Sequence, residues 1–357
     1  MHELIIQVPL LGMEWEAFIL LFITALAGGA FGAAIGALPA FIFTGFVVFL
    51  GEGLAYLQRE VAAVPAIDAT LGTNVTGVIG FGAITGPHIA FAGGVAASAY
   101  AGMKYPEMKP DGWDYHFGKN ILYAFGTQPD ILAVGAVFGV LGMLINQVAA
   151  AVGTPTDTIA LSVVLTALIA RLTFGYPLVG RPAGGGFLDM SPFEREEPAA
   201  AADGGTADGL YPNRLATEPW LPHQYKWAGV ATIGLVGGIL GGYIWIQTGS
   251  IFLGYAISAM SLLFLQLGVE KIPVTHHITL IGAVGAVVVD PMAGSVVALL
   301  AAGVFGVVSG LLGEVTQRIL YAHSGTHVDP PAMAIALAML VVAVLALLGV
   351  LPNAGYL

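Results

Sequence analysis

The chain has 357 residues, of which 57% are hydrophobic and only 9% are charged, whereas a soluble domain is about a quarter charged. Its net charge of −11 and its lack of a basic stripe argue against nucleic acid as a partner, and the acidic excess is compatible with a high-salt habitat. The absence of Cys excludes disulfides and thiolate metal sites.

Apolar runs of about 20 residues recur along nearly the whole chain and predict an all-α polytopic integral membrane protein with about ten transmembrane helices. The predicted spans are 17–38, 39–57, 72–101 (broken), 128–150, 156–175, 227–247, 250–268, 274–291, 295–315 and 331–351. Segment 179–225 is polar and acidic, so we expect a linker that cannot bury a core. The chain is thereby divided into a first membrane repeat, 1–178, the acidic linker, 179–225, and a second membrane repeat, 226–357.

Short motifs recur in the same order in the two membrane parts, which indicates an internal duplication. The matched pairs are Ala27–Gly32 with Val236–Gly241, Pro87–Ile89 with His276–Ile278, Pro129–Ile131 with Asp290–Met292, Gly135–Val140 with Ala302–Val307, and Gly153–Asp157 with Gly325–Asp329. Because each repeat would contain an odd number of spans, the second copy would be upside down in the membrane. The sequence therefore predicts two inverted five-helix repeats with broken or re-entrant helices.

The basic residues fall on one face of this arrangement. Arg59 is the only one on the face that carries the termini. The other face carries Lys104, Lys109, Lys119, Arg171, Arg181, Arg195, Arg214, Lys226, Lys271 and Arg318. Because Lys and Arg favour cytoplasmic loops, we expect a cell-membrane protein with both termini outside and the linker in the cytoplasm.

A surplus in the first repeat, Ala69 to Ala83, has no counterpart before His277 and contains Asn74 and Thr76. It is shorter than the roughly 20 residues of a full span. We expect a re-entrant segment or the first part of a broken helix, since a full extra span would remove the inversion.

Thr85-Gly86-Pro87-His88 has the sequence of a helix start, because Thr is a good N-cap and Pro is tolerated in the first turn. Thr275-His276-His277 repeats the arrangement in the second half. A helix that starts at membrane depth offers free N–H groups and a positive dipole end to an anion. We predict a midplane substrate site for a small anionic solute; the alternative places the histidines at the membrane interface. The site would consist of Thr85, Gly86, His88, Thr275, His276 and His277.

Ionisable groups within spans are costly and usually functional. Asp130, Asp290, Glu52 and Asn74 are therefore expected at a coupling-ion site. Coupling could use Na⁺ at Asp130 and Asp290, or H⁺ at the site histidines. The alternative for the two aspartates is stabilisation by helix dipoles near helix starts.

Two further patterns have structural interpretations. Asp157 and Asp329 lie in Gly-Thr-x-x-Asp turns and are expected to form N-caps or Asx turns. Small-residue ladders predict close helix contacts, and pairing of one ladder with the other would join the halves. The ladders are Gly28, Gly32 and Gly36, and Gly234, Gly238 and Gly242.

These features favour a secondary transporter, a permease or symporter, or a channel that works by alternating access around a site formed by two half-helix N-termini. A non-transporting membrane subunit that anchors a partner enzyme is the alternative. A metal-dependent intramembrane enzyme is less favoured, because His276 and His277 would point about 100° apart on a helix. We expect no enzyme activity, cofactor or bound metal. The expected partners are a small molecule or ion and the lipid bilayer, and homo-oligomerisation is left open.

Overall fold

The structure is a computed structural model that describes residues 7–60, 75–199 and 213–357. Asn74, expected at the coupling-ion site, and residues 69–73 of the surplus lie outside the described residues. Apart from two isolated backbone bridges, Gln7 with Glu14 and Pro198 with Leu215, the regular structure of the described residues is helical. The predicted all-α class is confirmed.

The apolar segments form helices close to the predicted spans. In the first half these are α1 (Trp15–Ile35), α2 (Ala37–Glu60), η1 (Val75–Gly80), η2 (Pro87–Phe91), α4 (Ala92–Lys104), α5 (Pro129–Ala151) and α6 (Thr158–Thr173). In the second half they are α8 (Trp227–Thr248), α9 (Phe252–Gln266), α10 (His276–Ala293), α11 (Ser295–Thr316), η7 (Gln317–Tyr321) and α12 (Pro330–Leu347). The connecting segments contain η3 (Pro106–Met108), η4 (Phe117–Lys119) and α7 (Ser191–Glu194).

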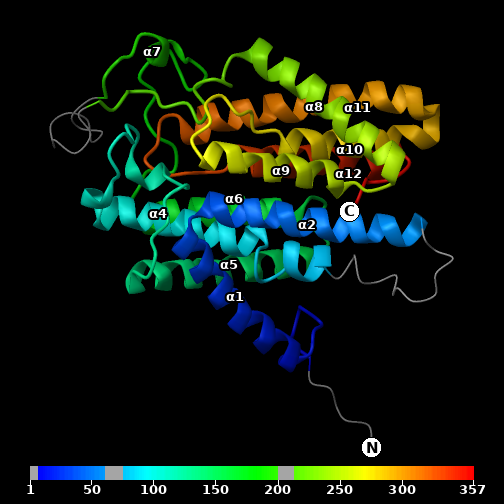
Figure 1. Ribbon diagram of the computed structural model, residues 1–357, viewed down its shortest axis with the longest axis horizontal. Helices are drawn as coiled ribbons and strands as arrows, with labels where there is room; N and C mark the ends of the chain where they lie inside the picture. The colour runs from blue at the N-terminus through cyan, green and yellow to red at the C-terminus, as the bar shows by residue number, and fades with distance from the viewer. Residues whose placement is uncertain (1–6, 61–74, 200–212) are drawn as a thin grey trace, which may run out of the picture.

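The two halves form two helical layers that lie against each other along their length (Figure 1). They meet where α2 packs against α9 and α6 packs against α12. Gly45 on α2 lies so close to α9 that a Cβ atom there would approach the backbone nitrogen of Met260 to 2.8 Å. The α7 region lies at one end of the layers and the C-terminus lies toward the other (Figure 1).

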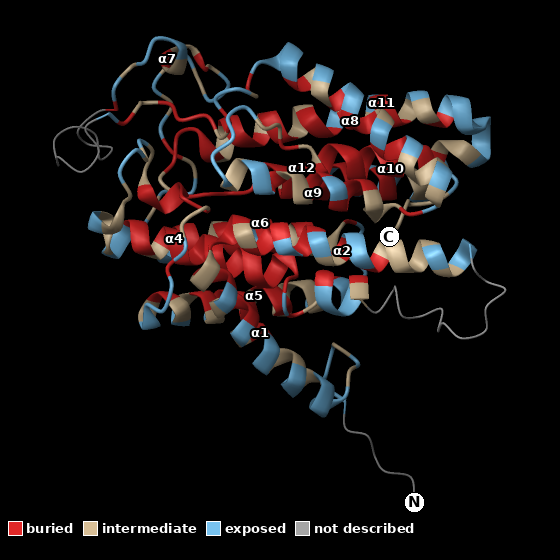
Figure 2. Ribbon diagram, in the orientation of Figure 1, coloured by how far each residue is buried: buried red, intermediate tan, exposed pale blue. Residues whose placement is uncertain are grey.

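Within the described residues, seven helical segments are long and apolar enough to cross a membrane, and α6 and α9 are shorter apolar helices. The seven are Trp15–Ile35, Ala37–Glu60, Pro129–Ala151, Trp227–Thr248, His276–Ala293, Ser295–Tyr321 and Pro330–Leu347. Buried residues gather inside the layers, while large apolar side chains are exposed on the outer helix faces (Figure 2). Such apolar exposure suits lipid contact rather than water, so these helices indicate a membrane location.

The glycine ladders pack within their own halves. A Cβ atom on Gly32 of α1 would lie 1.9 Å from the Ala90 carbonyl oxygen on η2. A Cβ atom on Gly238 of α8 would lie 2.3 Å from the Ala302 carbonyl oxygen on α11. The predicted close contacts therefore occur, but the expected pairing of one ladder with the other is wrong. The larger side chains between α2 and α9 join the halves instead.

Segment 179–225 is also different from the predicted linker. Met190 and Tyr225 form a small buried cluster with Ala322, which follows η7. Glu218, which is 1% exposed, forms ion pairs with Lys119 and Arg214. The expectation that this segment cannot bury a core is wrong for its described residues, because paired charges and a few aromatic rings hold it against the helices.

The predicted break in the first half is present. The described part of the surplus forms η1, and residues 81–86 then interrupt the helix before η2 runs directly into α4. Gly86, rather than Thr85, is the N-cap of η2. The Thr85 hydroxyl turns back and donates to the carbonyl oxygens of Ile79 (2.8 Å) and Gly80 (3.2 Å). The predicted N-cap role of Thr85 is therefore wrong, because Gly86 occupies the cap position and no side chain caps the helix there.

Candidate functional site

A cavity of about 1250 Å³ lies between the two halves and is lined by residues from both. Its walls are mostly aromatic and aliphatic, contributed by α2, η2 and α6 on one side and by α9, α10 and α12 on the other. Large, mostly apolar clefts with a few polar groups are typical ligand sites. The cavity between the halves is therefore the main candidate site.

Positions matched by the sequence motifs line this cavity in pairs. Pro87 and His276 begin equivalent helices, and Asp157 and Asp329 precede the last helix of each half. Extending the same registers adds three further pairs. They are Phe91 with Leu280, Ala160 with Ala332, and Val163 with Ile335.

Asp157 and Asp329 cap their helices in the same way. One oxygen of Asp157 accepts from the Ala160 amide at 2.7 Å, and one oxygen of Asp329 accepts from the Ala332 amide at 2.8 Å. Their second oxygens have different partners. Asp157 accepts from the Tyr356 hydroxyl at 2.6 Å, and Asp329 lies 3.2 Å from Nε2 of His327.

The two carboxylates are staggered along the cavity. Thr156, next to Asp157, donates to the carbonyl oxygen of Ala336, seven residues beyond Asp329, at 2.5 Å. At 1.5 Å per residue, this contact sets the carboxylates about 10 Å apart along the helix direction. Both lie close enough to Tyr255 on α9 to interact with it electrostatically.

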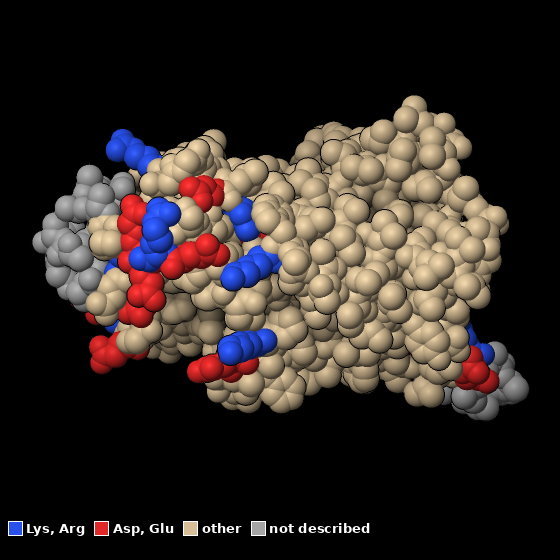
Figure 3. All heavy atoms as spheres, turned by 90° about the horizontal axis from the view of Figure 1, so that it is seen from above, with Lys and Arg blue, Asp and Glu red and all other residues tan. Residues whose placement is uncertain are grey.

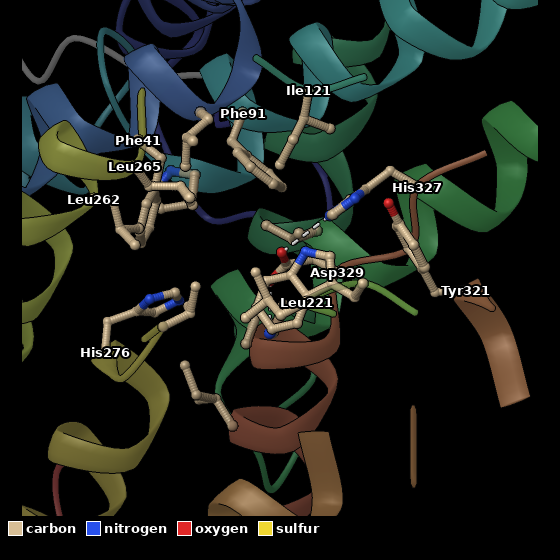
Figure 4. Close-up of a pocket in the computed structure, with 18 of the residues that line it drawn as sticks. Phe41, Phe91, Ile121, Leu221, Leu262, Leu265, His276, Tyr321, His327 and Asp329 are labelled. Carbon is tan, nitrogen blue, oxygen red and sulfur yellow. Dashed lines mark hydrogen bonds and ion pairs between the residues drawn. The ribbon is translucent and has the colours of Figure 1, made fainter. Parts of the chain in front are cut away.

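His276 lies among aromatic rings at the start of α10. Its ring centroid is 4.7 Å from that of Phe41 and 5.8 Å from that of Tyr255. Its Nδ1 is buried without a hydrogen-bond partner among the described residues. Figure 4 shows His276 across the cavity from the His327–Asp329 pair.

The remaining predicted substrate residues lie around this cavity rather than on its wall. His88 and His277 are buried, but neither lines it. His277 packs against Gly313 on α11, where a Cβ atom would lie 3.2 Å from Nε2. Thr85 and Gly86 form the turn before η2, and Thr275 is the N-cap of α10 without a side-chain capping bond.

The described coupling-ion candidates lie elsewhere. Asp130, in the first turn of α5, pairs with Lys104 at 2.8 Å. Asp290 accepts from Ser295 at 2.8 Å and lies in the last turn of α10, so its predicted place at a helix start is wrong. Pro291 is part of α10, and Gly294 at φ 79° ends that helix. Glu52 bridges Thr76 (3.0 Å) and Ser250 (2.5 Å). None of the three lines the cavity.

A buried ion network closes the end of the cavity near the α7 region. The Lys119 ammonium lies 2.6 Å from Glu218, which also pairs with Arg214 at 3.0 Å. Burial lowers the pKa of Lys119 to about 8, although the Glu218 carboxylate opposes this shift. Burial would raise the pKa of Glu218, but the two adjoining cations outweigh it and lower that pKa below its usual value.

His327 and the cavity role of the two capping aspartates were missed by sequence reasoning. The repeated Gly-Thr-x-x-Asp motif was found, but an N-cap explains it locally. The usable signal was that the motif recurs in both halves immediately before an apolar helix. Among the described residues, no three His, Asp or Glu side chains come together as a potential metal site.

Comparison with known proteins gives a family without an assigned activity. The model of a family described as "Family of unknown function (DUF7973)" matches residues 10–357. No curated protein and no solved structure matches the chain. Since the match covers nearly the whole sequence, the chain belongs to the DUF7973 family.

Proposed function

We propose that this protein is a secondary transporter or channel that moves a small solute through the cavity between its halves. The observation that carries the proposal is that this one cavity is lined by equivalent residues of the two halves, with Asp157 and Asp329 among them. A site shared by two repeats suits alternating access, in which one half moves against the other around a fixed centre.

We propose further that the halves are inverted five-helix repeats, which gives ten spans when α6, α9 and the broken η2–α4 segment are included. Similar packing in the two halves supports this. A Cβ atom on Gly28 would lie 3.1 Å from Ile89, and one on Gly237 would lie 2.8 Å from Ile278. These isoleucines are matched positions in the predicted duplication. The identical capping by Asp157 and Asp329 is independent support.

Hydrogen bonds between the two halves lie at both ends of the cavity, and we propose them as gates. On the side of Asp157, Ser250 donates to Glu52 at 2.5 Å and Arg59 donates to the Thr248 carbonyl oxygen at 2.5 Å. On the side of Asp329, Arg171 donates to the Thr326 hydroxyl at 2.7 Å. In alternating access, the hydrogen bonds at one end would break while those at the other end remain.

We propose that the termini are outside and the α7 region is cytoplasmic, in the cell membrane. The support is the bias of Lys and Arg toward one face of the predicted arrangement. Figure 3 agrees with a membrane-embedded middle. On the side of the molecule that it shows, charged side chains gather toward the two ends and leave a wide uncharged band between them.

The alternative, a non-transporting subunit that anchors an enzyme, predicts no water-accessible cavity between the two histidine motifs, which begin at Pro87 and His276. Both residues line one, which favours transport. Because Asp157 and Asp329 line the cavity and Asp130 and Asp290 do not, we assign any proton or Na⁺ coupling to the former pair.

The test uses the absence of Cys from the chain. Val163→Cys and Ile335→Cys place one thiol at each member of a matched cavity pair. In vesicles of defined orientation, a membrane-impermeant thiol reagent should modify each variant from both sides. Val304→Cys is the control, because Val304 is 59% exposed on the outer face of α11 and should be protected by lipid. Reaction of both cavity thiols from one side only, or from neither, contradicts alternating access.

A further inference from the structure

A continuous series of aromatic rings follows the cavity wall. It contains residues of both halves, and every neighbouring pair has ring centroids within 6.0 Å. In order, the contacts are Tyr356–Phe252 (5.2 Å), Phe252–Phe81 (5.1 Å), Phe81–Tyr255 (5.8 Å), Tyr255–Phe41 (6.0 Å), Phe41–Phe91 (5.9 Å), Phe91–His327 (5.9 Å) and His327–Tyr321 (5.4 Å). All of these residues line the cavity.

The two carboxylates stand near the ends of this series. Asp157 is bonded to Tyr356, its first ring, and Asp329 to His327, its last ring but one. Asp157 accepts from two backbone amides, of Ile159 and Ala160, and from Tyr356, and Asp329 has one capping bond and one contact with His327. A carboxylate offers about four acceptor sites. Both could therefore still accept hydrogen bonds or a charge contact from a ligand.

The charges that face the cavity are mainly negative. Besides Asp157 and Asp329, the acidic residues Asp114 and Glu270 line it at exposed positions. The basic lining residues are Lys119 and Lys271. Lys119 is already paired with Glu218 and its side chain is 0% exposed, so it is not available to an incoming anion. A negative cleft with low-dielectric walls concentrates cations.

We propose that the solute is an organic cation with an apolar body, bound between Asp157 and Asp329 and moving along the aromatic series. Ring faces attract a cation within about 6 Å of the centroid, most strongly where water is excluded. A cavity of about 1250 Å³ accommodates such a ligand with water. The inference deepens the proposed transport function, but binding is tested apart from movement.

Figure 4 shows how the inner part of this route is arranged. Phe91 lies across the space from Asp329, while the Phe41 ring lies against His276, with ring centroids 4.7 Å apart. In the order of the ring contacts, a cation that leaves Asp329 meets Phe91 and then Phe41 before it reaches Tyr255. Because His276 has its Nδ1 unpartnered, it adds a polar group beside this step.

The experiment is calorimetric titration of the purified full-length protein in detergent with two probes that share a benzyl group. Benzyltrimethylammonium carries a positive charge and phenylacetate a negative one. The cation should bind saturably and the anion at least roughly tenfold more weakly, as one lost charge contact implies. No saturable cation binding, or equal binding of phenylacetate, overturns the inference and favours the anion predicted from the sequence.

Asp157→Asn and Asp329→Asn assign the contact, because Asn keeps a good N-cap while it removes the charge. Each should weaken benzyltrimethylammonium binding roughly tenfold. Glu107→Gln, which removes an exposed carboxylate outside the cavity, should leave it unchanged. Cation binding that is insensitive to both aspartate variants contradicts the inference.

If an aspartate variant fails to fold, Phe41→Leu and the comparison of the two probes on the unchanged protein still test whether the cavity binds a cation. Phe41→Leu should weaken cation binding roughly threefold to thirtyfold through the lost ring face. The thiol-accessibility test does not involve a ligand. If the cation does not bind but both thiols react from both sides, the inference about charge fails while the transport proposal stands.

Discussion

Asp157 and Asp329 occupy equivalent positions in the two halves, but their surroundings differ. The capping bonds are nearly identical at 2.7 and 2.8 Å. The Asp157 side is completed by the hydroxyl of Tyr356, from the C-terminal residues, and the Asp329 side by His327 of the adjoining loop. The two halves therefore share the backbone contact, while the group that meets the second carboxylate oxygen differs between them.

The contacts at the two ends of the cavity, beyond these carboxylates, differ as well. Near Asp329, the Lys119 ammonium lies 4.5 Å from the centroid of the Tyr321 ring and forms an ion pair with the buried Glu218. Near Asp157, the two halves are connected by single hydrogen bonds of Glu52 and Arg59. Buried ion pairs are costly to separate, because each charge then lacks its partner. We therefore expect the Asp157 side to open more easily than the Asp329 side.

The largest effect should come from Glu218→Ala. It leaves Lys119 and Arg214 close together without the carboxylate that both contact. Removal of one member of a buried ion network costs about 3–5 kcal/mol. Thermal unfolding in detergent should show this loss. Glu107→Gln, at an exposed position, is the control and should unfold like the unchanged protein. A loss no larger than that of the control would show that the network contributes little to the stability of the folded protein.

Acid should weaken the same network without a substitution. The pKa of Glu218 is lower in the folded protein than its ordinary value of 4.5, so the unfolded chain binds the proton first as the pH falls. The stabilisation is complete above pH 4.5 and is lost as the pH falls toward the folded pKa. Glu218→Gln cannot titrate, so its difference in unfolding temperature from the unchanged protein should shrink below that pH. An equal difference at neutral and acid pH would contradict this.

Sequence patterns were sufficient where a local rule decides the structure. The apolar runs gave the helices, and the repeated motifs identified Pro87 and His276, which both line the cavity. The Asp-Pro pair at 290–291 was misleading, because such a pair favours a helix start, whereas here it lies in the last turn of α10, where the Ser295 hydroxyl donates to Asp290.

The remainder of the site depends on distances between segments far apart in the chain. Thr85 lies one residue before the cap of η2, and its hydroxyl donates to carbonyl groups at the end of η1. Tyr356 reaches Asp157 across 199 residues. His88 was expected in the site rather than Pro87 because of its chemistry, and both His276 and His277 were expected there. The helix rotation turns the earlier residue of each pair, Pro87 and His276, toward the cavity. Periodicity in nearly uniform apolar helices does not give that rotation.

The smallest effect is expected for the two partners of the carboxylates themselves. Tyr356→Phe keeps the ring contact with Phe252 but removes the hydroxyl that lies 2.6 Å from Asp157. A hydrogen bond to a charged group contributes about 1.5–3 kcal/mol. His327→Phe keeps the ring contacts with Phe91 and Tyr321 and removes a longer contact, 3.2 Å, so it should cost less.

Thermal unfolding of the two variants, compared with Tyr243→Phe on the exposed face of α8, measures this difference. Tyr356→Phe should also speed modification of the Val163→Cys thiol from the outside more than His327→Phe does, since it loosens the side that we expect to open. If His327→Phe has the larger effect on both measurements, then the side of Asp329 is the weaker closure. The strong ion network beyond it would then hold the α7 region in place without closing the cavity.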